Sequence, residues 1–283
     1  MADSDQARLL RELAAEAQES SKPPPPRRLP AIAVCGGKGG VGKTCVAVNL
    51  GVLLAKQQRQ TLLVDCDLGL ANADILLGLN PERTLADVLI GSTPIGSAIC
   101  KHASGLALLP AASGRDDLTR MRQDQFDRLL DELGRVCQGY DLAILDLPAG
   151  IQREVLQLMI HAQLVLVVIT PDPTSLTDAY AQIKLLEQQC PGHDIRVLVN
   201  QASHHDEGVA CFNRLRKVVQ SYLGRDLAFI GQLPQDRHVR DAIRARQPFA
   251  SRRDLAITQA LSGVAMRLKG EDFGRAAATN ARH

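Results

Sequence analysis

The stretch Gly36-Gly37-Lys38-Gly39-Gly40-Val41-Gly42-Lys43-Thr44 decides the fold of this chain. From Gly37 to Thr44 it fits the phosphate-binding pattern G-x-x-x-x-G-K-[ST]. In such a loop the glycines let backbone N–H groups surround phosphate oxygens, the lysine reaches the β- and γ-phosphates, and the hydroxyl group ligates Mg²⁺. A glycine-rich turn that binds nothing is the alternative.

The residues on both sides of the loop favour phosphate binding. Residues 31–34 form a short apolar run typical of a buried strand, and residues 46–57 carry apolar side chains at helical spacing. The loop therefore connects a strand to a helix. Because the N-terminus of a helix has unpaired N–H groups and a positive dipole end, it would face the phosphates.

Length, charge and cysteine content limit the class of protein. A chain of 283 residues is long enough for one large α/β domain with appendages. A formal net charge of +2 argues against a surface that coats nucleic acid. The seven cysteines form no C-x-x-C pair, and the sequence shows no signal peptide and no apolar run of transmembrane length. We therefore expect a soluble cytoplasmic protein with reduced thiols and no metal ion other than Mg²⁺.

Strand and helix patterns alternate from residue 31 onward. We expect strands near residues 31–35, 61–65, 106–109, 141–146, 164–169, 195–200 and 227–230, and helices near 44–57, 84–90, 118–137, 150–161, 174–189, 208–223 and 254–268. Near-continuous apolar strands are typical of a parallel sheet that is covered on both faces. The predicted fold class is α/β, a P-loop NTPase three-layer α/β/α sandwich with a mostly parallel, twisted sheet and a nucleotide at its carboxyl edge.

The N-terminal residues differ from the rest of the chain. Residues 5–18 have helical periodicity, with Leu9, Leu10 and Leu13 on one face. Four prolines at 23–26 forbid a continuous helix and make a stiff spacer. We expect a tethered partner-binding helix at 1–20 and a Pro-rich linker at 21–30. A disordered tail, or a helix packed on its own domain, is the alternative.

Three carboxylates follow predicted strands whose ends lie beside the phosphate loop. Asp65 and Asp67 follow the apolar run 61–64, and Asp146 follows the run 142–145. In P-loop enzymes a carboxylate at a strand end holds Mg²⁺, usually through water, and a further polar group orients the attacking water. An Asp after a strand is often only a turn or cap residue, but the coincidence with the loop favours a functional role.

Several motifs resemble the MinD/ParA family of ATPases. Lys38 within KGGVGKT is similar to the deviant Walker A motif of that family, residues 65–74 to its first switch, and residues 146–150 to its Walker B motif and second switch. The resemblance continues through Asn200 and residues 231–236. Within the family, the strings DLGLANADILLGL, RTLADVL, LLPAASG and DPTSLTDAYAQIKLL resemble the flagellar-number regulators of the FlhG/FleN type.

The resemblance implies the cofactors ATP and Mg²⁺ and a role for each residue of the loop. Lys43 would bind the β- and γ-phosphates, and Lys38 would reach the partner's ATP across a nucleotide-sandwich dimer. A cation from the partner suits this chemistry, since phosphoryl transfer spreads negative charge over the γ-phosphate oxygens. The implied ATP-binding residues are Gly37, Lys38, Gly39, Gly40, Val41, Gly42, Lys43, Thr44 and Cys45, with Asn200, Pro234, Gln235 and Asp236 at the adenine.

The same resemblance assigns the catalytic and metal-binding side chains. Lys38, Lys43 and Asp67 form the implied catalytic set, in which Asp67 would orient the attacking water. Thr44 would ligate Mg²⁺ directly, while Asp65 and Asp146 would support the ion through water.

The resemblance also implies partners. Asp5-Gln6-Ala7-Arg8-Leu9-Leu10-Arg11 is similar to the D-Q-A-x-x-L-R element by which the FlhG type stimulates FlhF, a signal-recognition-type GTPase. The implied partner-binding residues are Asp5, Gln6, Ala7, Leu10 and Arg11. The implied function is an ATP-dependent dimerisation switch with slow hydrolysis, acting on the FlhF-like GTPase and on flagellar switch, C-ring or transcription-activator components. A division-site or chromosome-partition ATPase, or a nucleotide-stabilised antagonist of a transcription activator, is the alternative.

The C-terminal residues allow two interpretations. Residues 253–269 hold Ile257, Leu261, Val264 and Leu268 on one side. We expect a terminal helix docked on the core; the alternative is a weak membrane helix that makes the protein peripheral on the inner face of the cytoplasmic membrane. The ATPase domain is expected to span residues 31–269, followed by a polar tail at 270–283.

Overall fold

A computed structural model describes residues 28–69, 71–111 and 121–269. Its strands are β1 (Leu29–Cys35), β2 (Thr61–Asp65), β3 (Cys100–Lys101), β4 (Ala107–Leu109), β5 (Leu142–Asp146), β6 (Ala162–Ile169), β7 (Ile195–Ala202) and β8 (Ala228–Pro234). Within these ranges they form one sheet in the order β3-β4-β2-β5-β1-β6-β7-β8. All neighbouring strands are parallel except β3 and β4. The seven expected strands and the mostly parallel sheet are confirmed.

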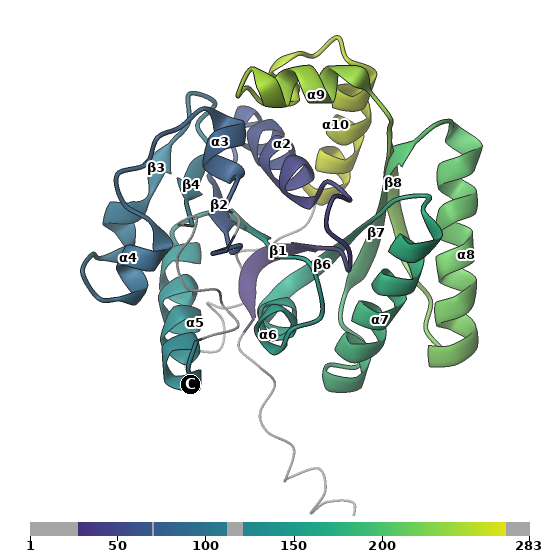
Figure 1. Cartoon of the computed structure of the whole chain (residues 1–283), viewed down its shortest axis with the longest axis horizontal. Coiled ribbons are helices and arrows are strands. Elements are labelled where there is room, and N and C mark those ends of the chain that lie inside the picture. Colours follow the sequence, from purple (N-terminus) through teal and green to yellow (C-terminus); the bar gives the residue numbers. More distant parts are fainter. Residues whose placement is uncertain (1–27, 70, 112–120, 270–283) are drawn as a thin grey trace, which may run out of the picture.

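The helices lie on both faces of this sheet (Figure 1). The α-helices are α2 (Lys43–Lys56), α3 (Ala73–Leu77), α4 (Leu85–Leu89), α5 (Gln123–Cys137), α6 (Arg153–His161), α7 (Pro173–Gln189), α8 (His205–Leu223), α9 (Arg237–Arg244) and α10 (Ala256–Lys269), and two 3₁₀ turns are η1 (Ile95–Ala98) and η3 (Phe249–Ser251). The expected three-layer sandwich is confirmed. Sequence analysis missed α3, α9 and β3, because α3 and β3 are very short and α9 buries none of its residues.

Two separate cores hold the layers together. In β1, Ala31 and Ala33 pack in one core with residues of α5, α6, α7 and α8. Ile32 and Val34 point to the opposite face, where they pack with residues of α2 and α10. This alternation is the two-residue period of a strand that is buried on both faces. The phosphate loop therefore starts from the most enclosed part of the sheet, between β5 and β6.

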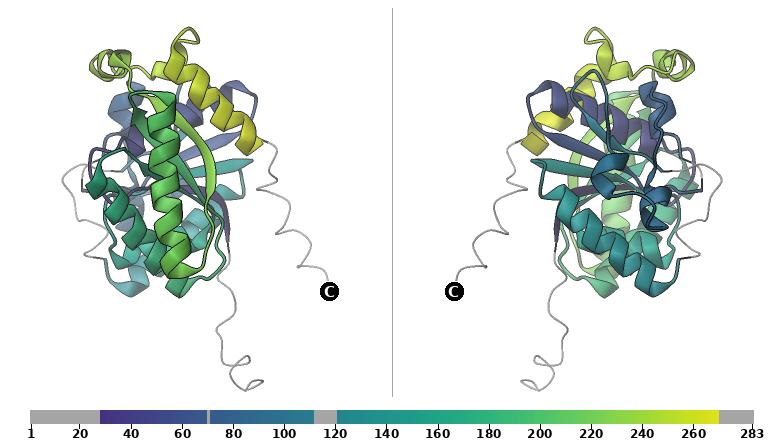
Figure 2. Two further views of the ribbon diagram at one scale, coloured as in Figure 1. Left: turned by 90° about the vertical axis from the view of Figure 1, so that its right-hand side faces the viewer. Right: turned by 90° about the vertical axis from the view of Figure 1, so that its left-hand side faces the viewer.

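The last described helix, α10, docks on the core. Its residues Ile257, Leu261, Val264 and Leu268 are at most 3% exposed and belong to the same core as α2. Figure 2 shows α10 lying along the molecule beside β8. The core-docked interpretation is confirmed, because the apolar side that a membrane would have to bind is already covered.

Some expected segments fall outside the described residues. These are the tethered helix at 1–20 with Asp5, Gln6, Ala7, Leu10 and Arg11, residues 21–27 of the linker, the start of the helix expected at 118–137, and the tail at 270–283. They stay predictions. β1 begins at Leu29, two residues before the expected domain start. Within the ranges that are described, no helix combines the length and apolarity needed to span a membrane.

Candidate nucleotide-binding site

The loop between β1 and α2 has the backbone geometry that a phosphate site requires. Gly40 and Gly42 have φ angles of 85° and 91°, which an L side chain rarely adopts. A Cβ atom on Gly37 would lie 2.3 Å from the Cβ of Asp178, so the chain passes too close for any side chain there. Gly42 caps α2 without a side-chain hydrogen bond. The first N–H groups of α2 are therefore left for a ligand.

Asn200, near the end of β7, braces this loop. Its Nδ2 donates to the carbonyl oxygen of Val41 at 2.8 Å, and its Oδ1 accepts from the backbone N–H of Gln201 at 2.9 Å. A Cβ atom on Gly42 would lie 2.4 Å from Asn200 Nδ2. The Asn200 amide thus fixes the shape of the loop. Its expected contact with adenine stays a prediction.

The segment 234–236 lies at the same edge of the sheet. The Gln235 N–H donates to the carbonyl oxygen of Ala202 at the end of β7, at 2.9 Å. Asp236 caps α9 by accepting from the N–H of His238 at 2.9 Å. The Gln235 N–H and the Asp236 carboxylate are therefore both used in local structure. The adenine contact itself stays a prediction.

Asp65 and Asp146 form a buried pair beside the loop. They are register partners at the ends of β2 and β5, and each is 1% exposed. Burial raises the pKa of Asp65 to about 6. Burial and the neighbouring Asp65 carboxylate raise the pKa of Asp146 well above its ordinary value. Two carboxylates in this position repel each other and lack solvation, so they favour a cation between the sheet edge and the phosphates.

The donor set at this place fits Mg²⁺. The Thr44 side chain hydrogen-bonds Asp146, while Asp146 Oδ1 is buried without a hydrogen-bond partner among the described residues. Lys43, 8% exposed, adds its positive charge close to Asp146. Hydroxyl and carboxylate oxygens are the ligands that Mg²⁺ prefers, often through water. Thr44, Asp65 and Asp146 would hold the ion, which supplies charge neutralisation at the phosphates.

Asp65 also shapes the loop that follows β2. Its Oδ1 accepts from the N–H of Asp67 at 3.0 Å, and its Oδ2 accepts from the N–H groups of Asn72 and Ala73 at 3.2 Å. The carboxylate therefore anchors both ends of the segment that carries Asp67. This brings Asp67 to the loop edge, where it is partly exposed. Its role towards the attacking water stays a prediction.

Lys38 pairs with residues that follow β6, whereas Asp146 ends β5 on the other side of β1. The Nζ of Lys38 forms an ion pair with Asp172 Oδ2 at 2.9 Å and donates to Thr174 Oγ1 at 2.7 Å. The hydrogen bond from Lys38, together with those from Thr174, lowers the pKa of Asp172 to about 2. Asp172 also caps α7 by accepting from the Thr174 N–H at 2.8 Å. Sequence analysis assigned no role to Asp172; its signal was the Asp-Pro-Thr sequence directly after a predicted strand.

Cysteines near the loop are unreactive. Burial raises the pKa of Cys35 and of Cys45 to about 12, and it raises the pKa of Cys66 well above its ordinary value. All seven cysteines are free thiols, as the composition predicted. Cys45 Sγ lies within 3.7 Å of Asn49 Nδ2, inside the first turns of α2. Since the thiolate is the reactive form, these side chains act as small apolar groups.

Comparisons with known proteins agree with the geometry. The protein family described as AAA domain matches residues 30–191. The antiactivator FleN of Pseudomonas aeruginosa is 42% identical over 216 residues, which cover 76% of this chain and 77% of that protein. The flagellum site-determining protein YlxH of Helicobacter pylori is 31% identical over 76% of this chain and 73% of its own. The chain belongs to the MinD/ParA family of P-loop ATPases, close to FleN.

A solved structure supports the same assignment. The septum site-determining protein MinD of Pyrococcus horikoshii, in complex with Mg-ADP, superimposes with a TM-score of 0.70 and 25% identity, covering 84% of this chain and 95% of its own. This MinD/ParA chain is therefore an ATPase with the fold expected from its sequence. The family resemblance stated from the motifs is confirmed. The individual roles of its site residues stay predictions.

Proposed function

We propose that this MinD/ParA ATPase is an ATP-dependent dimerisation switch that regulates flagellar number or assembly. The similarity to the antiactivator FleN and to the flagellum site-determining protein YlxH supports the flagellar role. The geometry of the phosphate loop supports the switch. ATP and Mg²⁺ are the proposed ligands, and the proposed place of action is the cytoplasm, with any membrane attachment peripheral.

The position of Lys38 carries the proposal. Lys38 leaves the loop on the opposite side from Thr44 and Asp146, and its side chain is 43% exposed. A lysine used only by its own nucleotide would be expected beside Lys43, which is buried. A half-exposed cation at the rim instead suits the γ-phosphate of ATP in a second subunit, where it stabilises the charge of the transition state.

The proposed cycle depends on the γ-phosphate. ATP held by Lys43 and Mg²⁺ in one subunit attracts Lys38 of the other, so two bound nucleotides join two subunits. Asp67 orients the attacking water, and hydrolysis removes the group that Lys38 contacts. Because only the triphosphate state makes this contact, loss of the γ-phosphate favours the monomer. Hydrolysis is slow because its machinery is complete only in the dimer.

The proposed output is stimulation of an FlhF-like GTPase through residues 5–11. This part rests on the sequence resemblance of the N-terminal element. The similarity to FleN, which is an antiactivator, favours a second output, restraint of a flagellar transcription activator. The two outputs use different surfaces of one switch and do not exclude each other.

Dimerisation of an Asp67→Ala protein tests the switch. We expect this variant to accumulate as a dimer with ATP and Mg²⁺, because it binds both ligands but does not activate water. Multi-angle light scattering measures its mass with ATP, with ADP and without nucleotide. A dimer with ATP alone supports the proposal, and a monomer under all three conditions contradicts it.

A further inference from the structure

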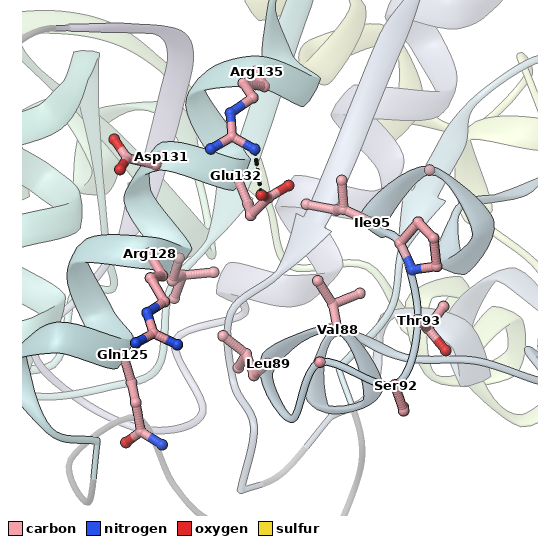
Figure 3. Close-up of a pocket in the computed structure, with 14 residues that line it drawn as sticks. Val88, Leu89, Ser92, Thr93, Ile95, Gln125, Arg128, Asp131, Glu132 and Arg135 are labelled. Atoms are coloured by element: carbon pink, nitrogen blue, oxygen red, sulfur yellow. Dashed lines mark hydrogen bonds and ion pairs between the residues drawn. The ribbon is translucent and has the colours of Figure 1, made fainter.

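The largest cavity in the described part of the molecule lies away from the nucleotide site. It is a groove of about 720 Å³ between α5 on one side and α4 with η1 on the other. Figure 3 shows apolar Val88, Leu89 and Ile95 on one wall and charged Arg128 and Glu132 on the other. None of the residues assigned to ATP or Mg²⁺ lines it. The side chain that reaches the nucleotide site and has no role in the cycle so far lies on another helix, α7.

Helix α7 packs against the phosphate loop along one face. A Cβ atom on Gly37 would lie 2.3 Å from the Cβ of Asp178, so this turn of α7 touches the loop directly. Gln182 follows Asp178 by one helical turn, and residues four positions apart lie on the same face of a helix. Figure 1 shows α7 beside α6, which begins shortly after the segment 146–150. The face that touches the phosphate loop therefore continues towards that segment.

Gln182 binds the segment 146–150, which resembles the Walker B motif and second switch. Its Nε2 donates to the carbonyl oxygen of Gly150 at 2.6 Å, and the residue is 2% exposed. A carbonyl oxygen only accepts hydrogen bonds, so the amide nitrogen must face it and Oε1 is turned away. Gly150 has a φ angle of 106°, which L side chains rarely adopt. The bond from Gln182 therefore fixes a peptide plane in a turn that follows Asp146 at the end of β5.

The other end of the Gln182 amide has no partner. Its Oε1 is buried without a hydrogen bond among the described residues. The gap that Gln182 shares with Gly150, Val155 and Met159 has no room for a water molecule. A buried amide with an unpaired oxygen is less favourable than an apolar side chain of the same size. Stability alone would therefore favour an apolar residue at this position, and the bond to Gly150 is what distinguishes glutamine from one.

We propose that Gln182 is a positioning residue for ATP hydrolysis. It touches neither ATP nor Mg²⁺; by holding the Gly150 carbonyl oxygen, it sets the position of residues 146–150 relative to the phosphates. Because α7 also carries Asp172, which pairs with Lys38, one helix contacts both the phosphate loop and the second switch. Hydrolysis itself follows from the family, and the inference rests on the proposed function only in taking residues 146–150 as the second switch.

Gln182→Met tests the positioning role, because it keeps the length of the side chain and removes the donor. We expect kcat for ATP hydrolysis to fall by about ten-fold, since a displacement of about 1 Å can cost up to about 100-fold even when the change lies away from the reacting atoms. The KM for ATP and the affinity measured by calorimetry should change by less than about two-fold, since Lys43 and Thr44 are intact. Rates are expressed per ATP-binding site counted by calorimetry, so that an unfolded fraction is not read as a loss.

Gln125→Met is the matched control for the loss of a glutamine hydrogen bond. Gln125 Oε1 accepts from the Arg122 N–H at 3.0 Å at the start of α5, beside the groove in Figure 3. This variant should lower the melting temperature and leave kcat per site unchanged. If Gln182→Met also lowers only the melting temperature, Gln182 has a purely structural role and the inference is overturned.

Gln182→Glu gives a second readout, which a purely structural role would not move. The introduced carboxyl group can donate to the Gly150 carbonyl oxygen only when it is protonated, and burial raises its pKa above the ordinary value of about 4.3. The kcat of Gln182→Glu, divided by that of the natural protein at the same pH, should therefore rise as the pH is lowered from about 8 to about 5.5. The same ratio for Gln182→Met should stay constant. A ratio for Gln182→Glu that stays low at every pH contradicts donation from this position.

Failure of this inference can be told apart from failure of the dimer switch. The mass of the Asp67→Ala protein with ATP tests the switch, whereas kcat per site tests Gln182. If the natural protein hydrolyses ATP as a monomer, the switch fails, and the kcat of Gln182→Met relative to the natural protein still decides the role of Gln182. If ATP produces the dimer but kcat is unchanged in Gln182→Met, the positioning role fails and the switch stands.

Discussion

The two ends of the phosphate loop are built in opposite ways. At the Mg²⁺ end, Lys43, Asp65 and Asp146 are 8%, 1% and 1% exposed, and their contacts come from β2, β5 and α2 of one subunit. At the other end, the side chains of Lys38 and Asp172 are 43% and 44% exposed, and their ion pair joins two surface segments. One end is fixed by burial, whereas the other is open to exchange of partners.

This difference in burial indicates which side chains of the loop could change partners during the proposed cycle. A buried charge that loses its partner carries a large desolvation penalty, so the Mg²⁺ end resists rearrangement. An exposed pair contributes little to stability, because water replaces either partner easily. In the proposed switch, ATP binding would therefore be a property of one subunit, while the response to the γ-phosphate would depend on side chains that a second subunit can engage.

The largest expected effect that tests this comparison is the loss of hydrolysis in Lys38→Ala. If Lys38 acts only on the ATP of a second subunit, turnover falls by about 10³-fold, the lower end of what a trans cation contributes to phosphoryl transfer. ATP affinity of the monomer should stay within about three-fold, since Lys43 and the loop backbone are intact. Phosphate release and calorimetry measure the two quantities.

Lys43→Ala is the matched control for that measurement. It removes the other lysine of the same loop and should weaken ATP binding itself. If Lys38→Ala loses affinity as strongly as Lys43→Ala does, Lys38 serves its own nucleotide, and the contrast between the two ends is wrong.

A smaller effect, on stability, tests the buried end. Asp146→Asn should raise the melting temperature of the nucleotide-free protein by about 2 to 4 °C, the shift that about 1 kcal/mol gives a chain of this size. The melting temperature should rise rather than fall because the pKa values of Asp146 and Asp65 are raised in the folded protein. A carboxylate whose pKa is higher in the folded state binds protons on folding, so stability falls as the pH rises from about 4 through the folded pKa, about 6 for Asp65.

Calorimetry across pH and magnesium concentration checks this sign. The advantage of Asp146→Asn should be absent near pH 4, where the carboxylates of the folded protein are protonated, and it should grow as the pH rises through the raised pKa of Asp146. In the natural protein, Mg²⁺ with nucleotide should reverse the order by neutralising the pair. If Asp146→Asn is less stable than the natural protein at pH 7 without nucleotide, groups of the protein itself stabilise the Asp146 carboxylate, and no metal ion is needed.

Sequence alone predicted the fold, and it predicted that Asp65 and Asp146 end neighbouring strands beside the phosphate loop; their roles towards Mg²⁺ stay predictions. The glycine spacing and the strand ends at Asp65 and Asp146 depend on local backbone chemistry and on parallel strand register, which the sequence pattern carries. The pairing of Lys38 with Asp172 was not predictable, because the two residues are 134 positions apart and meet only after β1 and β6 pair. The bond from Asn200 to Val41, 159 positions apart, has the same cause.

Other misses have a different physical reason. Helix α9 has no buried residue, so the apolar periodicity that identifies helices is absent from Arg237 to Arg244. The groove between α4 and α5 is formed by segments whose apolar residues also fit a buried interface. A sequence pattern shows that Val88, Leu89 and Ile95 are apolar, but only their arrangement shows that they line an open groove.

The smallest expected effect concerns the exposed pair, and it tests whether Lys38 is free to change partners. Asp172→Asn removes the charge that holds Lys38 and keeps an oxygen that caps α7, since Asn is as good a helix cap as Asp. The ATP-dependent dimer should tighten by roughly two-fold to five-fold, the range expected when one exposed ion pair no longer competes. Sedimentation equilibrium measures the affinity of the dimer. Both the natural and the Asp172→Asn proteins carry Asp67→Ala in this experiment, so that ATP is not hydrolysed.

Asp226→Asn is the matched control, because it removes another exposed carboxylate, which pairs with Arg216 away from the loop. It should leave the dimer unchanged. The low pKa of Asp172, about 2, means that this carboxylate stays charged at neutral and mildly acidic pH, so the effect of Asp172→Asn should not vary between about pH 6 and 8. A weaker dimer in Asp172→Asn would show that Asp172 itself contacts the second subunit. Lys38 and Asp172 would then be a fixed part of the interface between subunits. The two ends of the loop would differ in their exposure to solvent, but not in whether their side chains exchange partners.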